Sequence, residues 1–201
     1  MRPKTSTIQN TSEAMPGASK RDAWGVKAKE RFRVIQARSA ADLSTVRELF
    51  REYARSLEID LCFQGFEQEL AGLPGAYAPP RGLLLLGVGG AEVAGCVAVR
   101  PITESICEMK RLYVRPEFRR RGLGRILAQA AIDEAKQLGY KSLRLDTLSS
   151  MKEALALYGS LGFSRIEPYY HNPSGCAVFM ELQFRKRDKK DGQRPTGGRE
   201  P

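Results

Sequence analysis

The chain has 201 residues, of which 42 % are hydrophobic and 28 % are charged, a composition typical of a soluble globular protein. This balance excludes a collagen-like, a coiled-coil and a wholly disordered chain. The formal net charge is +10, but residues 1–30 carry six basic and three acidic groups, and residues 185–201 carry seven and three. The high isoelectric point therefore says little about the residues between.

Both ends of the chain are rich in polar and charged residues and lack an apolar period. We expect a disordered tail over 1–30, one domain over 31–184, and a disordered basic tail over 185–201.

No segment has the length or composition of a membrane anchor. The longest apolar stretch, 82–88, falls far short of the ~20 residues that cross a bilayer, and the N-terminus lacks the apolar part of a secretory signal. The four cysteines show neither C-x-x-C spacing nor the density of a disulfide scaffold. We therefore predict a cytoplasmic protein. Because His171 is the single histidine, we expect no metal site.

Apolar periods alternate between those of strands and helices along the middle of the chain. Ser39 and Asp42 form a capping-box pattern at the start of a helix that runs to about Leu57. A similar pattern, Ser150 with Glu153, predicts the start of a helix that ends at Leu161. Strands are predicted over 32–37, 83–88, 93–100, 106–114, 142–147, 163–166 and 176–184, and further helices over 66–70 and 123–138.

These elements give the order β-α-α-β-β-β-α-β-α-β-β, which predicts an α/β (α+β) fold. Short turns favour a mixed, mostly antiparallel sheet. The strand at 106–114, the helix after it and the strand at 143–147 form one β-α-β crossover, so these two strands should run parallel.

A short basic loop with two glycines, 115–125, joins that strand to the helix. Backbone N–H groups and the helix dipole at such a point favour an anion, and Gly122 and Gly124 leave room for a phosphate to approach the backbone. A basic turn capped by glycines is the alternative. The position between a strand and a long amphipathic helix favours the phosphate site.

Three segments together resemble the GNAT superfamily of acyl-CoA-dependent N-acetyltransferases. Arg119-x-x-Gly122-x-Gly124 is similar to its R/Q-x-x-G-x-G/A signature, 109–116 to its central strand, and 154–163 to its closing helix. The resemblance covers roughly 31–184. It implies helices on both faces of a sheet splayed between the two parallel strands, with acetyl-CoA as co-substrate in the gap.

The resemblance also implies the residues that bind this co-substrate. The diphosphate would lie on the backbone of Arg119, Arg120, Arg121, Gly122, Leu123, Gly124 and Arg125, and the pantetheine along that of Leu112, Tyr113 and Val114. Two positions depart from the family pattern. Met151 stands where many members have an asparagine, and Arg121 where many have glycine.

Two side chains are candidate catalytic groups. Tyr158 matches a tyrosine that often donates a proton to the departing thiolate, although it shares a helical face with core positions and could be core itself. Glu108, eleven residues before Arg119, matches a glutamate that some histone-acetylating members use as a base. A solvated strand residue is the equal alternative for Glu108.

The acceptor side is less defined. Loops at 60–66, 73–80 and 169–172 are expected near it, with Phe63 and Phe66 as core residues and His171 as an exposed one. Arg100, Lys110 and Arg111 could hold an acceptor carboxylate or be solvated.

We therefore predict transfer of an acetyl group to the primary amine of a small molecule by direct attack on the thioester. A protein lysine or N-terminal acetyltransferase is one rival. A non-catalytic coenzyme-binding or nucleic-acid-associated module is another, with the basic tail on phosphates. Neither nucleic acid nor a membrane is an expected partner, and a homodimer is left open.

Overall fold

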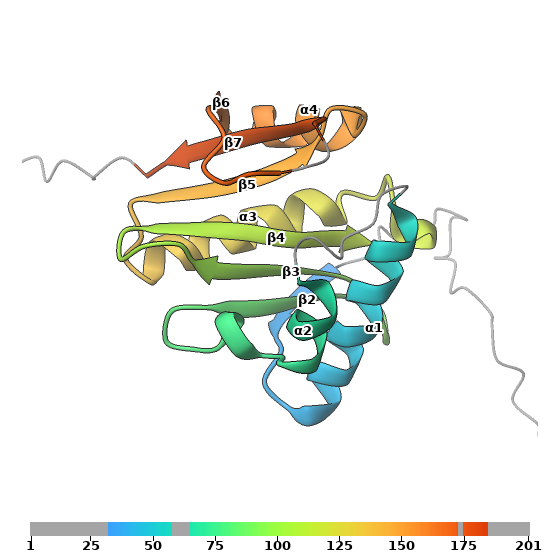
Figure 1. Cartoon of the computed structure of the whole chain (residues 1–201). Helices are drawn as coiled ribbons and strands as arrows, with labels where there is room; N and C mark the ends of the chain where they lie inside the picture. Colours follow the sequence, from blue (N-terminus) through green and yellow to red (C-terminus); the bar gives the residue numbers. More distant parts are fainter. Residues whose placement is uncertain (1–31, 58–64, 173–174, 185–201) are drawn as a thin grey trace, which may run out of the picture. The chain divides into compact units, whose positions relative to one another are not determined.

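The computed structural model describes residues 32–57, 65–172 and 175–184 (Figure 1). The two predicted tails and most of the loop at 60–66 lie outside these residues.

One sheet with helices on both faces forms the described part of the chain. Its strands are β1 (Phe32–Gln36), β2 (Leu83–Gly89), β3 (Glu92–Pro101), β4 (Ile106–Val114), β5 (Ser142–Leu148), β6 (Ser164–Ile166) and β7 (Ala177–Gln183). Its helices are α1 (Ala40–Ser56), α2 (Phe66–Ala71), α3 (Leu123–Gln137) and α4 (Lys152–Ser160), with short 3₁₀ helices η2 (Gly75–Tyr77) and η3 (Pro116–Phe118). The predicted order of strands and α-helices is confirmed.

The strands lie in the order β1-β2-β3-β4-β5-β7-β6, and all neighbours run antiparallel except β4 and β5. This parallel pair is the predicted crossover. It extends only from Ile106–Glu108 on β4 to the facing residues 142–144 on β5. Beyond that point the two strands separate, and β5 is drawn at an angle to β4 in Figure 1.

Two hydrophobic clusters fill the space between the sheet and its helices. The cluster on one face contains Phe50 of α1 and Leu70 of α2, and the cluster on the other contains Leu127 of α3 with Leu143 and Tyr158. Figure 1 shows α1 and α2 in front of the sheet and α3 behind it. Because both faces are covered, every residue of β2 is buried.

The start of α1 confirms the predicted capping box. Ser39 Oγ accepts a hydrogen bond from the Asp42 amide at 3.1 Å, and the Asp42 carboxylate accepts one from the Ser39 amide at 2.9 Å. That backbone bond, with a second from Arg38, holds the pKa of Asp42 below its usual range.

The capping box predicted for α4 is wrong. The helix begins at Lys152, and its N-cap is Met151, which makes no side-chain capping bond. Ser150 is instead enclosed in a turn that the Met151 amide closes by donating to the Leu148 carbonyl at 3.0 Å. Ser150 therefore belongs to the turn that ends β5, and it does not occupy the N-cap position of α4.

A glycine in β2 lets α3 approach the sheet closely. A Cβ built on Gly87 would lie 2.8 Å from Leu123 Cδ1, closer than side chains tolerate. The first residue of α3 is 1 % exposed as a result. This contact packs the first residue of α3 against β2.

Candidate active site

The loop before α3 has the backbone conformation of an anion-binding site. Arg120 has a φ of +61° and Gly122 a φ of +88°, so the chain turns sharply twice before the helix. The Ile126 amide donates to the Gly122 carbonyl at 3.2 Å, and no side chain caps the helix. The amides of the preceding helical residues point outward from the helix start, where the dipole is positive.

The two signature glycines differ in why they are needed. At Gly122 the positive φ itself favours glycine, and a Cβ there would meet no atom within 4 Å. At Gly124 a Cβ would make ordinary contacts, 3.8 Å to Leu157 and 3.9 Å to Val114. Since the protein's own packing would accept a side chain at Gly124, the free space fits a diphosphate that approaches the backbone.

The arginines of this loop surround it with positive charge. Arg119 Nε donates to the Val114 carbonyl at 3.0 Å, and its guanidinium lies 5.8 Å from the centre of the Tyr113 ring. Arg125 bonds Ser160 Oγ at 2.6 Å. Arg120 and Arg121 are exposed as well. In contrast, the Leu123 side chain is buried, so this residue has its backbone alone to offer a ligand.

A groove of about 800 Å³ runs from this loop along the end of β4. Leu112, Tyr113 and Val114 line it, as do Arg119 and Gly124. The structure therefore places the three predicted strand residues beside Arg119 and Gly124 of the loop. The other predicted loop residues do not line this groove: Arg120, Arg121, Gly122, Leu123 and Arg125.

A smaller pocket of about 90 Å³ continues the groove into the gap between β4 and β5. The two cavities share lining residues, among them Tyr53 of α1, Leu112 of β4 and Met151. Tyr158 and Asp146 line the smaller pocket. These two side chains therefore lie at the inner end of the continuous cavity.

Tyr158 belongs both to the core and to this pocket. It is 7 % exposed, and its ring packs 5.7 Å from that of Phe163. No described residue accepts or donates a hydrogen bond at its hydroxyl, which is unusual for a buried phenol. Burial raises its pKa, so the proton stays on the oxygen throughout the physiological range.

Glu108 is not the solvated strand residue of the alternative interpretation. It is 1 % exposed, and it accepts hydrogen bonds from Arg100 Nε and from the Tyr169 hydroxyl, both at 2.8 Å. It lines neither the groove nor the smaller pocket. Its role as a base remains a prediction.

Sequence reasoning missed Asp146. Its carboxylate lies 3.6 Å from Lys110 Nζ, and with burial it raises the pKa of Tyr170. A signal was present, since Asp146 alternates with Leu145 and Thr147 on the predicted strand and so shares the opposite face with Arg144. Nothing local shows, however, that β5 leaves β4 at this point.

The Arg111 guanidinium is buried and paired with a carboxylate, although the residue lines the smaller pocket. Its guanidinium bonds both oxygens of Glu69, at 2.6 and 3.1 Å, and Tyr77 donates to the same carboxylate at 2.7 Å. Although burial works in the opposite direction, Arg111 holds the pKa of Glu69 below its usual range. The ion pair links α2 to β4. Arg111 itself has a φ of +56°.

The predicted acceptor loops fall in different places. Asn172 lines the smaller pocket, whereas His171 is exposed and Phe66 is buried in the core, both as predicted. The loop at 73–80 contains η2 and packs through Tyr77. Phe63 lies outside the described residues.

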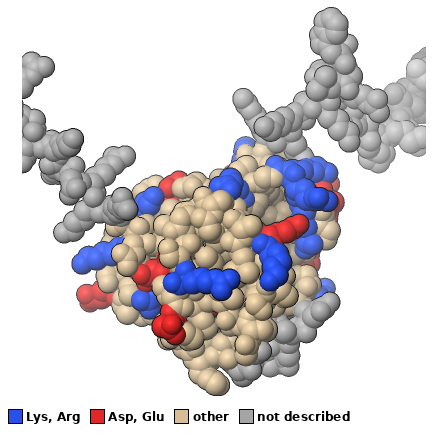
Figure 2. Space-filling view, turned by 90° about the horizontal axis from the view of Figure 1, so that it is seen from above, with Lys and Arg blue, Asp and Glu red and all other residues tan. Residues whose placement is uncertain are grey.

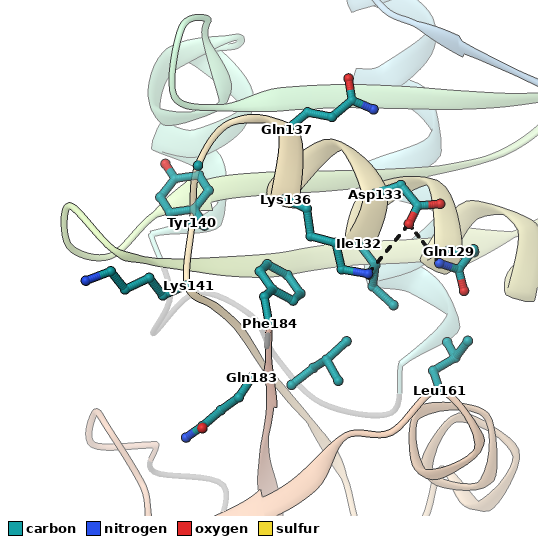
Figure 3. A pocket seen from close by; sticks show the side chains of 12 residues that line it. Gln129, Ile132, Asp133, Lys136, Gln137, Tyr140, Lys141, Leu161, Gln183 and Phe184 are labelled. Atoms are coloured by element: carbon teal, nitrogen blue, oxygen red, sulfur yellow. Dashed lines mark hydrogen bonds and ion pairs between the residues drawn. The ribbon is translucent and has the colours of Figure 1, made fainter. Parts of the chain in front are cut away.

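A larger pocket, of about 1030 Å³, lies elsewhere in the described part of the chain. Figure 3 shows it between the C-terminal half of α3 and the end of β7, with Lys136 Nζ 3.9 Å from Asp133 and 5.4 Å from the centre of the Phe184 ring. It contains none of the predicted site residues.

Within the described residues, no group of three or more His, Cys, Asp or Glu side chains could hold a metal ion. None of the helices described is long and apolar enough to cross a membrane.

Comparison with known proteins agrees with this geometry. The model of the acetyltransferase (GNAT) family matches residues 43–163. An uncharacterised N-acetyltransferase of Schizosaccharomyces pombe is 44 % identical over 147 residues, which cover 72 % of this chain and 90 % of the relative. A ribosomal protein bS18-alanine N-acetyltransferase of Salmonella typhimurium is 41 % identical over 94 residues, 43 % of this chain and 64 % of the relative.

Solved structures have the same fold. The ribosomal-protein-S18-alanine N-acetyltransferase of Escherichia coli superposes with a TM-score of 0.60 at 22 % identity, covering 80 % of this chain and 98 % of that one. An acetyltransferase of Salmonella typhimurium with its cofactor acetyl-CoA gives 0.58 at 20 % identity, covering 81 % and 99 %.

The fold is that of an N-acetyltransferase. The chain belongs to the GNAT family, and it is an acyl-CoA-dependent N-acetyltransferase. This result argues against the non-catalytic alternative.

Proposed function

We propose that the enzyme transfers an acetyl group from acetyl-CoA to a primary amine of a small molecule. The observation that carries the proposal is the continuity of the groove with the small pocket, where the buried Tyr158 hydroxyl lacks a partner among the described residues. A thioester in the groove would end beside this hydroxyl.

The backbone of 119–125 would hold the diphosphate, and that of 112–114 would pair with the pantetheine. The two positive φ values, the uncapped helix start and the open space at Gly122 support the first assignment. The lining of the groove by Leu112, Tyr113 and Val114 supports the second. Correct juxtaposition of thioester and amine is worth about 7–11 kcal/mol, so this positioning would supply most of the catalysis.

In the chemical step, the amine nitrogen forms a bond to the acetyl carbonyl carbon and the bond from that carbon to sulfur breaks. The nitrogen loses a proton and the sulfur gains one. Tyr158 would donate to the departing thiolate. The burial that raises the pKa of Tyr158 also disfavours a bare thiolate in the same place, so burial acts on the donor and the acceptor of this proton in the same direction.

A carboxylate would take the proton from nitrogen, directly or through water. Asp146 lines the pocket and is hydrogen-bonded by Tyr170, whereas Glu108 lies outside the pocket and both of its oxygens are bonded, to Arg100 and to Tyr169. The geometry therefore favours Asp146 for this step. Glu108 would contribute by holding Arg100 and Lys110 in place.

Surface charge supports a small acceptor over a basic peptide. On the face shown in Figure 2, acidic side chains lie among basic ones and form no continuous acidic surface. The relatives named as ribosomal-protein-alanine N-acetyltransferases favour the second candidate acceptor, a protein N-terminus.

The test is thiol release from acetyl-CoA by the purified full chain with amino acids, polyamines, aminoglycosides and peptides as acceptors. We expect turnover with a small amine, and a larger loss of kcat in Asp146→Asn than in Glu108→Gln. Turnover with peptides alone would favour the protein acetyltransferase. If no amine is acetylated and calorimetry detects no acetyl-CoA binding, the proposal fails.

A further inference from the structure

Three pairs of oppositely charged side chains lie in or beside the small pocket, and they differ in how tightly they close. Arg111 and Glu69 approach to 2.6 Å, and Arg100 and Glu108 to 2.7 Å. Lys110 Nζ, in contrast, stays 3.6 Å from Asp146 and 3.9 Å from Glu108, beyond hydrogen-bond distance. The first two pairs are hydrogen-bonded, whereas Lys110 and Asp146 are too far apart for a direct hydrogen bond.

Lys110 is also deeply buried for an ammonium group. Its side chain is 6 % exposed, and its nitrogen lies 5.8 Å from the centre of the Tyr170 ring. No described residue accepts a hydrogen bond from Nζ, which has three donors. Unmade hydrogen bonds at a buried charge are costly, so the geometry calls for an acceptor oxygen in the pocket that Lys110 lines.

The charges that remain for a ligand are one of each sign. Because Arg111 is neutralised by Glu69 and Glu108 by Arg100, the pocket lining offers the Lys110 ammonium and the Asp146 carboxylate. A zwitterion with its amine and carboxylate on one carbon complements this arrangement. Its ammonium would bind Asp146, and its carboxylate would bind Lys110.

We propose that the acceptor is a free α-amino acid whose carboxylate is bound by Lys110. The inference rests on the proposed function and adds the class of acceptor to it. A pocket of about 90 Å³ holds a group of a few heavy atoms, such as the amine, the α-carbon and the carboxylate. A peptide N-terminus has a neutral carbonyl at the same place and leaves the ammonium uncompensated.

Lys110 would also favour the reactive form of the acceptor. Before attack, the amine must lose a proton, and a second cation nearby disfavours the protonated form. Binding of the carboxylate and deprotonation of the amine would then be served by one side chain.

The experiment compares acceptors that differ by one carboxylate: leucine with isoamylamine, phenylalanine with phenethylamine, and serine with ethanolamine. For at least one pair, we expect wild-type kcat/KM to be about 10²-fold higher for the amino acid, since a site built for a polar group rejects the analogue that lacks it. In Lys110→Met, KM for the amino acid should rise about 10²-fold, and the preference for the amino acid over the matching amine should be lost. Lys110→Arg should retain part of the preference.

Lys136→Met is the matched control, because Lys136 also faces a carboxylate at 3.9 Å but lies in the distant pocket of Figure 3. It should keep the wild-type preference, and acetyl-CoA binding by calorimetry should be unchanged in every variant.

Several results would overturn the inference while leaving the proposed function intact. One is equal turnover of each amine and its amino acid by the wild-type enzyme, which needs no variant to fold. Another is an equal loss for both acceptors in Lys110→Met. A third is acetylation of Lys110 itself, found by mass spectrometry after incubation with acetyl-CoA alone. If neither member of any pair is acetylated, the proposed function fails as well.

Discussion

The two halves of the site are built from different parts of the chain. The half at the start of α3 consists of backbone, since two positive φ angles and an uncapped helix create it within a few consecutive residues. The half between β4 and β5 consists of side chains. Tyr53, Lys110, Asp146 and Tyr158 reach it from α1, β4, β5 and α4.

This difference explains which half a sequence can reveal. A backbone site needs glycines at fixed spacing, and Arg119-x-x-Gly122-x-Gly124 displays them. A side-chain site needs distant residues whose meeting depends on the course of the strands. The same difference predicts that single substitutions damage the two halves in different ways.

The largest expected effect is at the backbone half. In Gly122→Glu, a carboxylate would occupy the diphosphate position, and the residue would have to keep a φ of +88°. We expect loss of detectable turnover and of acetyl-CoA binding by calorimetry.

Gly139→Glu is the matched control, since Gly139 has a φ of +86° and equally open surroundings at the far end of α3. It should lose about 1 kcal/mol of stability and keep its activity. Full activity in Gly122→Glu would refute the diphosphate site.

At the side-chain half, Tyr158→Phe should lower kcat about 10²- to 10⁴-fold with unchanged acetyl-CoA affinity. Because no described residue bonds the hydroxyl, its removal should leave the melting temperature unchanged. Tyr140→Phe should show the reverse, because this hydroxyl donates to the Arg81 carbonyl at 2.7 Å outside the site. We expect Tyr140→Phe to lose about 1 kcal/mol of folding stability, with normal turnover.

Wild-type turnover in Tyr158→Phe would contradict the role of Tyr158 as the proton donor.

A smaller effect, on stability, is expected at the support of the side-chain half. Arg111→Met would leave the largely buried Glu69 carboxylate without its partner cation, at a cost of about 3 kcal/mol measured by urea unfolding. Since the pKa of Glu69 is lowered in the folded protein, its contribution is complete above its unfolded pKa of about 4.3. It should fade as the pH falls through the lower, folded value.

Arg111→Met should lack that part of the acid dependence. Identical pH profiles of unfolding for the variant and the wild type would contradict the assigned partnership.

Most of the fold was predictable because its signals are local. The Ser39 and Asp42 capping box, the alternating strands and the stripe of α3 each depend on neighbouring residues. The equivalent pattern at Ser150 gave a wrong prediction of the helix start, because Ser150 lies in a turn at the end of β5. Local patterns compete, and the sequence alone does not rank them.

The side-chain half was predictable only in part. Resemblance pointed to Tyr158, which lines the small pocket, and to Glu108, which does not. The Tyr169 hydroxyl that bonds Glu108 comes from a loop 61 residues away. The pairing of Arg111 with Glu69 spans 42 residues. Such contacts depend on tertiary packing, which no window of neighbouring residues records.

The brevity of the pairing between β4 and β5 has a consequence for measurement. Beyond Glu108, the edge of β4 that faces β5 is not paired with that strand. The backbone N–H and C=O groups on this edge therefore form hydrogen bonds with water or with an extended ligand. Deuterium uptake at 112–114 should therefore slow when acetyl-CoA binds, while uptake in β2, buried between two strands, should stay constant. Occupancy of the groove would then be visible without any chemistry taking place.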